Sequence, residues 1–175
     1  MTGVWPIRDF TVQLDTTGLV ASDIAAIDGP LNRVFAAWSG VCGVSFRPPA
    51  DPAWSPTNLV IRFVTDLRSD PTVANADAQA GAWLNGYELG LTDEPLNVGP
   101  DSTLVMRLNT SPVGGYTDEK LYQVILHELG HFLGLDHCDT DEPSCMSATL
   151  DERVTAPQPW EIVQVQTAYG PPRSE

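Results

Sequence analysis

The 3 histidines of this chain all lie between positions 127 and 137, and their spacing constrains the fold more than any other feature. His127 and His131 are four residues apart, so on a helix their rings occupy one face, one turn above the other. Gly134 can adopt the left-handed conformation that ends a helix at little steric cost, and the returning chain can then bring His137 to the same point. The segment therefore predicts a buried helix, a glycine turn and three converging imidazoles.

Three neutral imidazoles that meet at one point are the ligand set of a catalytic zinc ion, because they leave a fourth position open for water. Glu128 follows the first histidine and is close enough to reach that water without being a ligand itself. We therefore expect one Zn²⁺ held by His127, His131 and His137. Glu128 is expected to act as the general base for attack of the water on a carbonyl group. The same nitrogens would also accept other transition metals.

The pattern H-E-x-x-H-x-x-G-x-x-H, with Met146 nine residues after the last histidine, resembles the metzincin zinc peptidases. Within that clan the chain is most similar to the matrixin (matrix metalloproteinase-like) catalytic domains, because Asp136 precedes the third histidine. The resemblance implies a zinc endopeptidase with an α+β fold. That fold is a mixed, twisted sheet of about five strands on two helices, with a methionine turn at Met146 and a C-terminal helix after it. It would form a single catalytic domain over residues 1–175.

The resemblance also implies where a protein or peptide substrate binds. Residues Gly81, Ala82, Trp83 and Leu84 match an edge strand that pairs with extended substrate by adding a strand to the sheet. The loop over residues 147–158 matches the outer wall of the pocket that receives the substrate side chain just after the cut. Gln123, one turn before His127, is a candidate for shaping that pocket. The second, structural zinc of matrixins is not expected, because no further histidines remain.

Residue periodicity predicts the remaining elements of the fold. Strands are expected over residues 7–14, 44–47, 59–64, 81–84 and 103–108. Ser22 or Asp23 would cap a first helix that ends at Gly40, and Thr117 would cap the helix that carries the histidines. Pro159 at a first-turn position begins a helix that stops at Gly170.

The cysteines bear on the compartment of the protein. Cys138 and Cys145 are seven positions apart, and we expect a disulfide between them, with separate thiols or a second metal site as alternatives. Cys42 would remain an unpaired, buried thiol. A disulfide favours an oxidising compartment, so we expect a secreted, extracellular protein, although residues 1–10 show no signal peptide.

The charge balance limits the partners. With 23 acidic and 9 basic residues the formal net charge is -14, which disfavours nucleic acid as a partner. No stretch has the apolar length of a membrane span, so no membrane association is expected, and we expect a monomer. The acidic residues of the loop that follows the third histidine could bind Ca²⁺ or could simply be solvated: Asp139, Asp141 and Glu142.

Two other functions are compatible with the same residues. One is a catalytically silent binding module with a metzincin fold, which would be expected to lose Glu128 or a metal ligand, whereas this chain keeps all four. The other is a zinc hydrolase that acts on a different amide, such as a peptide cross-link of a cell wall. Cleavage assays with the wild type and a Glu128 variant separate the three.

Overall fold

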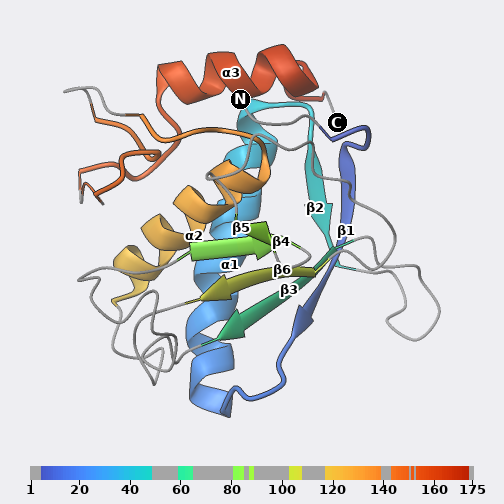
Figure 1. Cartoon of the computed structure of the whole chain (residues 1–175), viewed down its shortest axis with the longest axis vertical. Helices are drawn as coiled ribbons and strands as arrows, with labels where there is room; N and C mark the ends of the chain where they lie inside the picture. Colours follow the sequence, from blue (N-terminus) through green and yellow to red (C-terminus); the bar gives the residue numbers. More distant parts are fainter. Residues whose placement is uncertain are drawn as a thin grey trace.

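The computed structural model has an α+β architecture in which a six-stranded sheet packs on helices (Figure 1). It describes residues 5–48, 59–64, 81–84, 87–88, 103–107, 117–138, 143–149, 151 and 153–173. The elements follow one another as β1 (Asp9–Asp15), α1 (Ala21–Val41), β2 (Ser45–Arg47), β3 (Leu59–Val64), β4 (Gly81–Leu84), β5 (Tyr87–Glu88), β6 (Thr103–Arg107), α2 (Asp118–Phe132) and α3 (Pro159–Tyr169).

The sheet is mixed, with strand order β2-β1-β3-β6-β4-β5. The first four strands of that order run parallel, while β4 is antiparallel to β6 and to β5. Parallel neighbours need a crossover connection, and α1 supplies it between β1 and β2. The expected strands all form, but the count of about five was too low. The additional strand, β5, has only two residues, too few to produce a recognisable alternation in the sequence.

Helix α1 forms the layer behind the sheet and packs against α2 (Figure 1). Its inward face carries the apolar residues that recur at helical spacing, among them Ile27, Leu31, Val34 and Trp38, all buried. The expected N-cap at Ser22 or Asp23 was wrong: Val20 is the N-cap, and no side chain caps the helix. Val20 has the extended backbone that is typical of an N-cap residue, with φ -89° and ψ 162°. The helix therefore begins at Ala21, before either of the expected capping residues.

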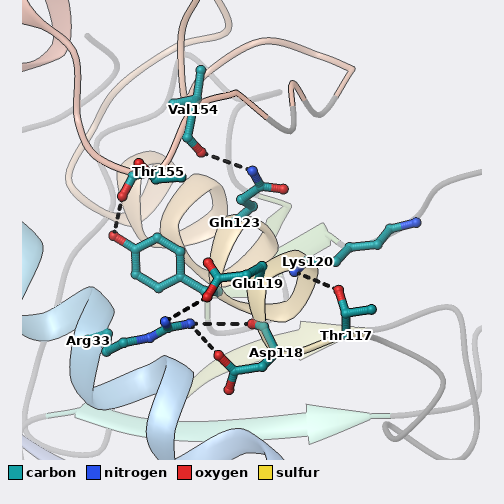
Figure 2. A network of polar contacts seen from close by, with 9 residues as sticks. Arg33, Thr117, Asp118, Glu119, Lys120, Gln123, Val154 and Thr155 are labelled. Carbon is teal, nitrogen blue, oxygen red and sulfur yellow. Dashed lines mark hydrogen bonds and ion pairs between the residues drawn. The ribbon is translucent and has the colours of Figure 1, made fainter.

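Helix α2 lies at the centre of the molecule and is buried on every side from Leu121 to Phe132. It begins as the sequence predicts, because the Thr117 side chain accepts a hydrogen bond from the Lys120 amide at 3.2 Å. At its start Arg33 of α1 bonds Asp118 and Glu119 (Figure 2). Helix α3 lies across one end of the molecule (Figure 1) and starts with a proline, also as predicted.

The main core lies between the sheet and the helices. Its largest fully buried side chains come from all three helices and from strands β1 and β3: Trp38, Tyr169, Phe10, Phe132, Ile27, Leu59 and Ile61. Among the described residues, no helix is long and apolar enough to cross a membrane. The core therefore anchors α2 from several directions, which fixes the backbone that carries two of the histidines.

Candidate metal centre

His127 and His131 occupy the same face of α2 and are both buried. The Nδ1 atom of His127 lies 2.8 Å from the carbonyl oxygen of Cys145, and Nδ1 of His131 lies 2.8 Å from that of Leu135. A carbonyl oxygen can only accept, so each Nδ1 must carry the proton and donate it. Each Nε2 atom therefore keeps an unprotonated lone pair, which is the form that binds a metal ion.

The turn after α2 brings His137 to the other two rings. Gly134 has φ 89°, a left-handed conformation that favours glycine. Its amide donates to the His131 carbonyl at 2.9 Å, and the Leu135 amide donates to the Gly130 carbonyl at 3.0 Å. These bonds close the end of the helix and reverse the chain. The glycine turn expected from the sequence is confirmed.

The three Nε2 atoms converge on one point. That of His131 lies 3.0 Å from that of His127 and 3.2 Å from that of His137. Ligands bound to a tetrahedral zinc at about 2.0–2.1 Å would lie about 3.3 Å apart, close to this spacing. Within the described parts of the chain, the three histidines form a group whose possible ligand atoms all lie within 4.8 Å of one another. Their donor chemistry and spacing fit a zinc ion.

Burial keeps the two helical imidazoles neutral. Burial, together with the neighbouring His131 ring, lowers the pKa of His127 to about 3. Burial likewise lowers the pKa of His131 to about 4, against the opposing effect of its bond to the Leu135 carbonyl. A metal ion competes with protons for these nitrogens, so low pKa values favour metal retention in mildly acidic solution.

Glu128 lies in α2 next to the first histidine and is buried, with 4% of its surface exposed. A carboxylate is seldom buried at this depth without a structural or functional reason. Its neighbours on the helix are His127 and Leu129. The position that sequence spacing assigned to the general base is thus inside the protein, beside the ligand set.

Met146 lies beneath the histidine helix, at Gly130. The methionine is fully buried, and a β-carbon built at Gly130 would lie only 2.4 Å from the Met146 sulfur. Only a residue without a side chain allows this close approach. The Met146 carbonyl accepts a hydrogen bond from the Cys138 amide at 2.8 Å, which ties the turn to the residue after His137. Met146 therefore supports the metal site without belonging to it.

Sequence reasoning missed two residues that hold this turn. The Ser144 hydroxyl accepts from the Met146 amide at 2.9 Å and donates to the Glu161 carboxylate at 2.6 Å. Glu161 is fully buried in α3, and its other oxygen accepts from the Gln158 amide at 2.7 Å. The sequence does show the spacing of a capping box between Gln158 and Glu161. Nothing in it indicates that the same carboxylate reaches Ser144.

The expected disulfide is wrong: Cys138 and Cys145 are buried and are not joined by a disulfide. Burial, together with the nearby Glu161 carboxylate, raises the pKa of Cys145 well above its ordinary value. Thiolates are the species that form disulfides, so this environment disfavours oxidation. A hydrogen bond from the Cys138 amide to the Met146 carbonyl, rather than a covalent bridge, joins the two segments. Cys42 is also free and buried, as predicted.

The remaining predicted elements are placed in part. Strand β4 contains Gly81, Ala82, Trp83 and Leu84 and pairs with β6 along its whole length. On its other side, β5 pairs with Trp83 and Leu84. The acids for which calcium binding or simple solvation was left open, Asp139, Asp141 and Glu142, lie outside the described residues.

Comparison with known proteins agrees with this centre. An archaemetzincin of Aeropyrum pernix is 40% identical over 65 residues, which are 36% of this chain and 34% of that protein. The chain thus spans about a third of the length of that relative. The sequence model of the matrixin family matches residues 5–170, which is nearly the whole chain and includes all three histidines, Glu128 and Met146. The chain therefore belongs to the matrixin family.

Proposed function

We propose that this protein is a zinc-dependent endopeptidase with Glu128 as its general base. The convergence of the three Nε2 atoms, two of them on rings buried in α2, supports the proposal most strongly. Family membership supports it independently, since the match extends over residues 5–170. We treat residues 1–175 as a single catalytic domain on the same ground.

His127, His131 and His137 would hold the ion. Zinc bound by three neutral ligands lowers the pKa of a bound water to about 7 and polarises a carbonyl oxygen. Two of the rings are already oriented by the Cys145 and Leu135 carbonyls, so little reorganisation is needed on binding. Glu128 would take a proton from the attacking water and then give it to the leaving amine nitrogen.

The substrate would be a protein or peptide in extended form. Residues Gly81 and Ala82 of β4 lie beyond the two residues that β5 pairs with, so this half of the strand is the proposed site of substrate pairing. We further propose that the protein acts as a monomer and outside the cell. The cysteines do not add support for secretion, because the disulfide that favoured it is not formed.

The decisive experiment compares the wild type with Glu128→Gln on a peptide library, after zinc loading. We expect wild-type cleavage that stops when zinc is removed, and a loss of about 10²- to 10⁴-fold in kcat/KM for the variant. Elemental analysis should show equal zinc in both proteins. Glu119→Gln is the matched control, because Glu119 is an exposed glutamate of the same helix; its activity should equal that of the wild type.

Each alternative predicts a different result. A silent binding module would bind zinc but cleave no peptide. A cell-wall hydrolase would release products from cross-linked wall peptides and leave linear peptides intact. Either result, or full activity of Glu128→Gln, would overturn the proposal.

A further inference from the structure

The end of α2 carries carbonyl groups that the helix itself cannot satisfy. An α-helix leaves its last carbonyls without partners inside the helix. In α2 these include the carbonyls of Phe132 and of the C-cap residue Leu133, and both residues are buried. A buried carbonyl without a partner is costly, so these two groups need donors from elsewhere in the fold.

Trp5, which precedes β1, donates to the first of these carbonyls. Its indole nitrogen lies 2.5 Å from the Phe132 carbonyl oxygen, and the centroids of the two aromatic rings are 5.2 Å apart. Trp5 is itself buried, with 5% of its surface exposed. The indole nitrogen can only donate, so the bond fixes the direction in which the Phe132 carbonyl points.

Tyr169, the last residue of α3, donates to the second carbonyl. Its hydroxyl donates to the Leu133 carbonyl at 3.2 Å and accepts from the Trp5 amide at 3.3 Å. Burial raises the pKa of Tyr169 to about 12, so the hydroxyl keeps the proton that it donates. Trp5 and Tyr169 are therefore bonded to each other as well as to the end of α2.

The backbone that these bonds hold leads directly into the metal site. Gly134 follows Leu133 and reverses the chain. The next residue, Leu135, accepts the Nδ1 proton of His131 at 2.8 Å with its carbonyl, and His137 follows two residues later. A shift of the Leu133 backbone would thus move both the carbonyl that orients one ligand ring and the third ligand itself. Such outer contacts affect metal affinity because they hold the ligand rings in the binding orientation.

From this geometry we infer that Trp5 and Tyr169 are positioning residues of the metal centre, which hold the end of α2 in the arrangement that brings the three Nε2 atoms together. The inference rests on the zinc site of the proposed function. Without these bonds the reversal at Gly134 can adopt more conformations in the metal-free protein. Zinc binding must then order it, and the lost conformational entropy weakens the affinity.

The test measures zinc affinity rather than catalysis. Trp5→Phe and Tyr169→Phe each remove one donor and keep an aromatic ring. Zinc is titrated into each metal-free protein against a competing chelator, under conditions in which circular dichroism shows every variant to be fully folded. Each variant should bind zinc about 3- to 10-fold more weakly than the wild type, a smaller loss than the 10- to 100-fold that follows removal of a direct partner of a ligand ring. The visible absorption spectrum of Co²⁺ bound in place of zinc should also change, because it reports the arrangement of the ligands.

Tyr122→Phe is the matched control. Tyr122 lies near the opposite end of α2, and its hydroxyl donates to the Thr155 carbonyl at 2.9 Å (Figure 2). The substitution removes the same kind of bond, from a tyrosine hydroxyl to a backbone carbonyl, far from the reversal at Gly134. It should destabilise the fold as Tyr169→Phe does, but leave the zinc affinity and the Co²⁺ spectrum unchanged.

A loss of affinity in Trp5→Phe or Tyr169→Phe, with none in Tyr122→Phe, supports the inference. Wild-type affinity in both variants would overturn it, and so would an equal loss in the control. If Tyr169→Phe does not fold, Trp5→Phe decides alone.

Peptide cleavage by the wild type, measured in parallel, separates this inference from the peptidase proposal. Zinc binding that depends on Trp5 and Tyr169, without any cleavage, would leave the inference standing and refute the peptidase proposal. Cleavage by the wild type, with unchanged zinc affinity in both variants, would do the reverse.

Discussion

The contact between Gly130 and Met146 allows a quantitative prediction for Gly130→Ala. The new β-carbon would lie 2.4 Å from the Met146 sulfur and 3.2 Å from Cζ2 of Trp38. Ordinary contacts between such atoms are about 3.5–4.0 Å long, so the sulfur must retreat by about 1 Å. Overpacking of this kind costs about 1–3 kcal/mol, and the better helix propensity of alanine offsets about 1 kcal/mol of it. We expect a net loss of up to about 2 kcal/mol in the free energy of unfolding.

A double-mutant cycle isolates the contact itself. Removal of the methionine side chain in Met146→Ala should cost about 2–5 kcal/mol, but in that background Gly130→Ala no longer clashes with sulfur and should be neutral or stabilising. The coupling energy between the two sites should thus be about 1–3 kcal/mol, measured by urea unfolding followed through tryptophan fluorescence. Additive effects of the two substitutions would refute the packing of Met146 against Gly130.

Two further predictions concern the end of α2 and the dependence of stability on pH. Trp5→Phe removes the 2.5 Å hydrogen bond from the indole nitrogen to the Phe132 carbonyl, so it should lower the free energy of unfolding by about 1–3 kcal/mol. Trp160→Phe, at an exposed position, is the control and should cost less than about 0.5 kcal/mol. Equal effects of the two substitutions in urea unfolding would contradict this prediction. In the zinc-free protein the lowered pKa values, about 3 for His127 and about 4 for His131, mean that the folded state binds fewer protons than the unfolded state below pH 6.5. The stability that depends on neutral His127 and His131 is therefore full above pH 6.5 and is lost as the pH falls toward 4. The urea midpoint of the EDTA-treated protein should decline over that range. The decline should be smaller in a His127→Gln, His131→Gln double variant.

Much of the metal centre follows from local sequence. The four-residue spacing of His127 and His131 acts within one helical turn, and the left-handed preference of Gly134 acts at a single residue. Such short-range features have the same effect on the local backbone wherever the segment lies in the fold. The ends of α2 and α3 were predictable for the same reason, since Thr117 and Pro159 act on the adjacent backbone.

Predictions that depended on distant residues fared less well. The disulfide was inferred from a seven-residue separation, but the environment of the Cys145 thiol is set by burial in the core and by Glu161, sixteen positions further along the chain. Strand order could not be read from the chain either, because β3 pairs with β6 rather than with its successor β4. Sequence periodicity describes which residues form a strand, not which strands become neighbours.

By itself, the sequence determined the ligand types, their helical spacing, the glycine reversal and the burial of α2. Only the tertiary structure decided which groups support that site: Met146 against Gly130, Glu161 through Ser144, and Gln123 across to the Asp151 and Val154 carbonyls. The physical reason is the distance along the chain over which each kind of interaction acts. Backbone preferences and side-chain periodicity act over a few residues, whereas these contacts join segments that approach only when the whole core has packed.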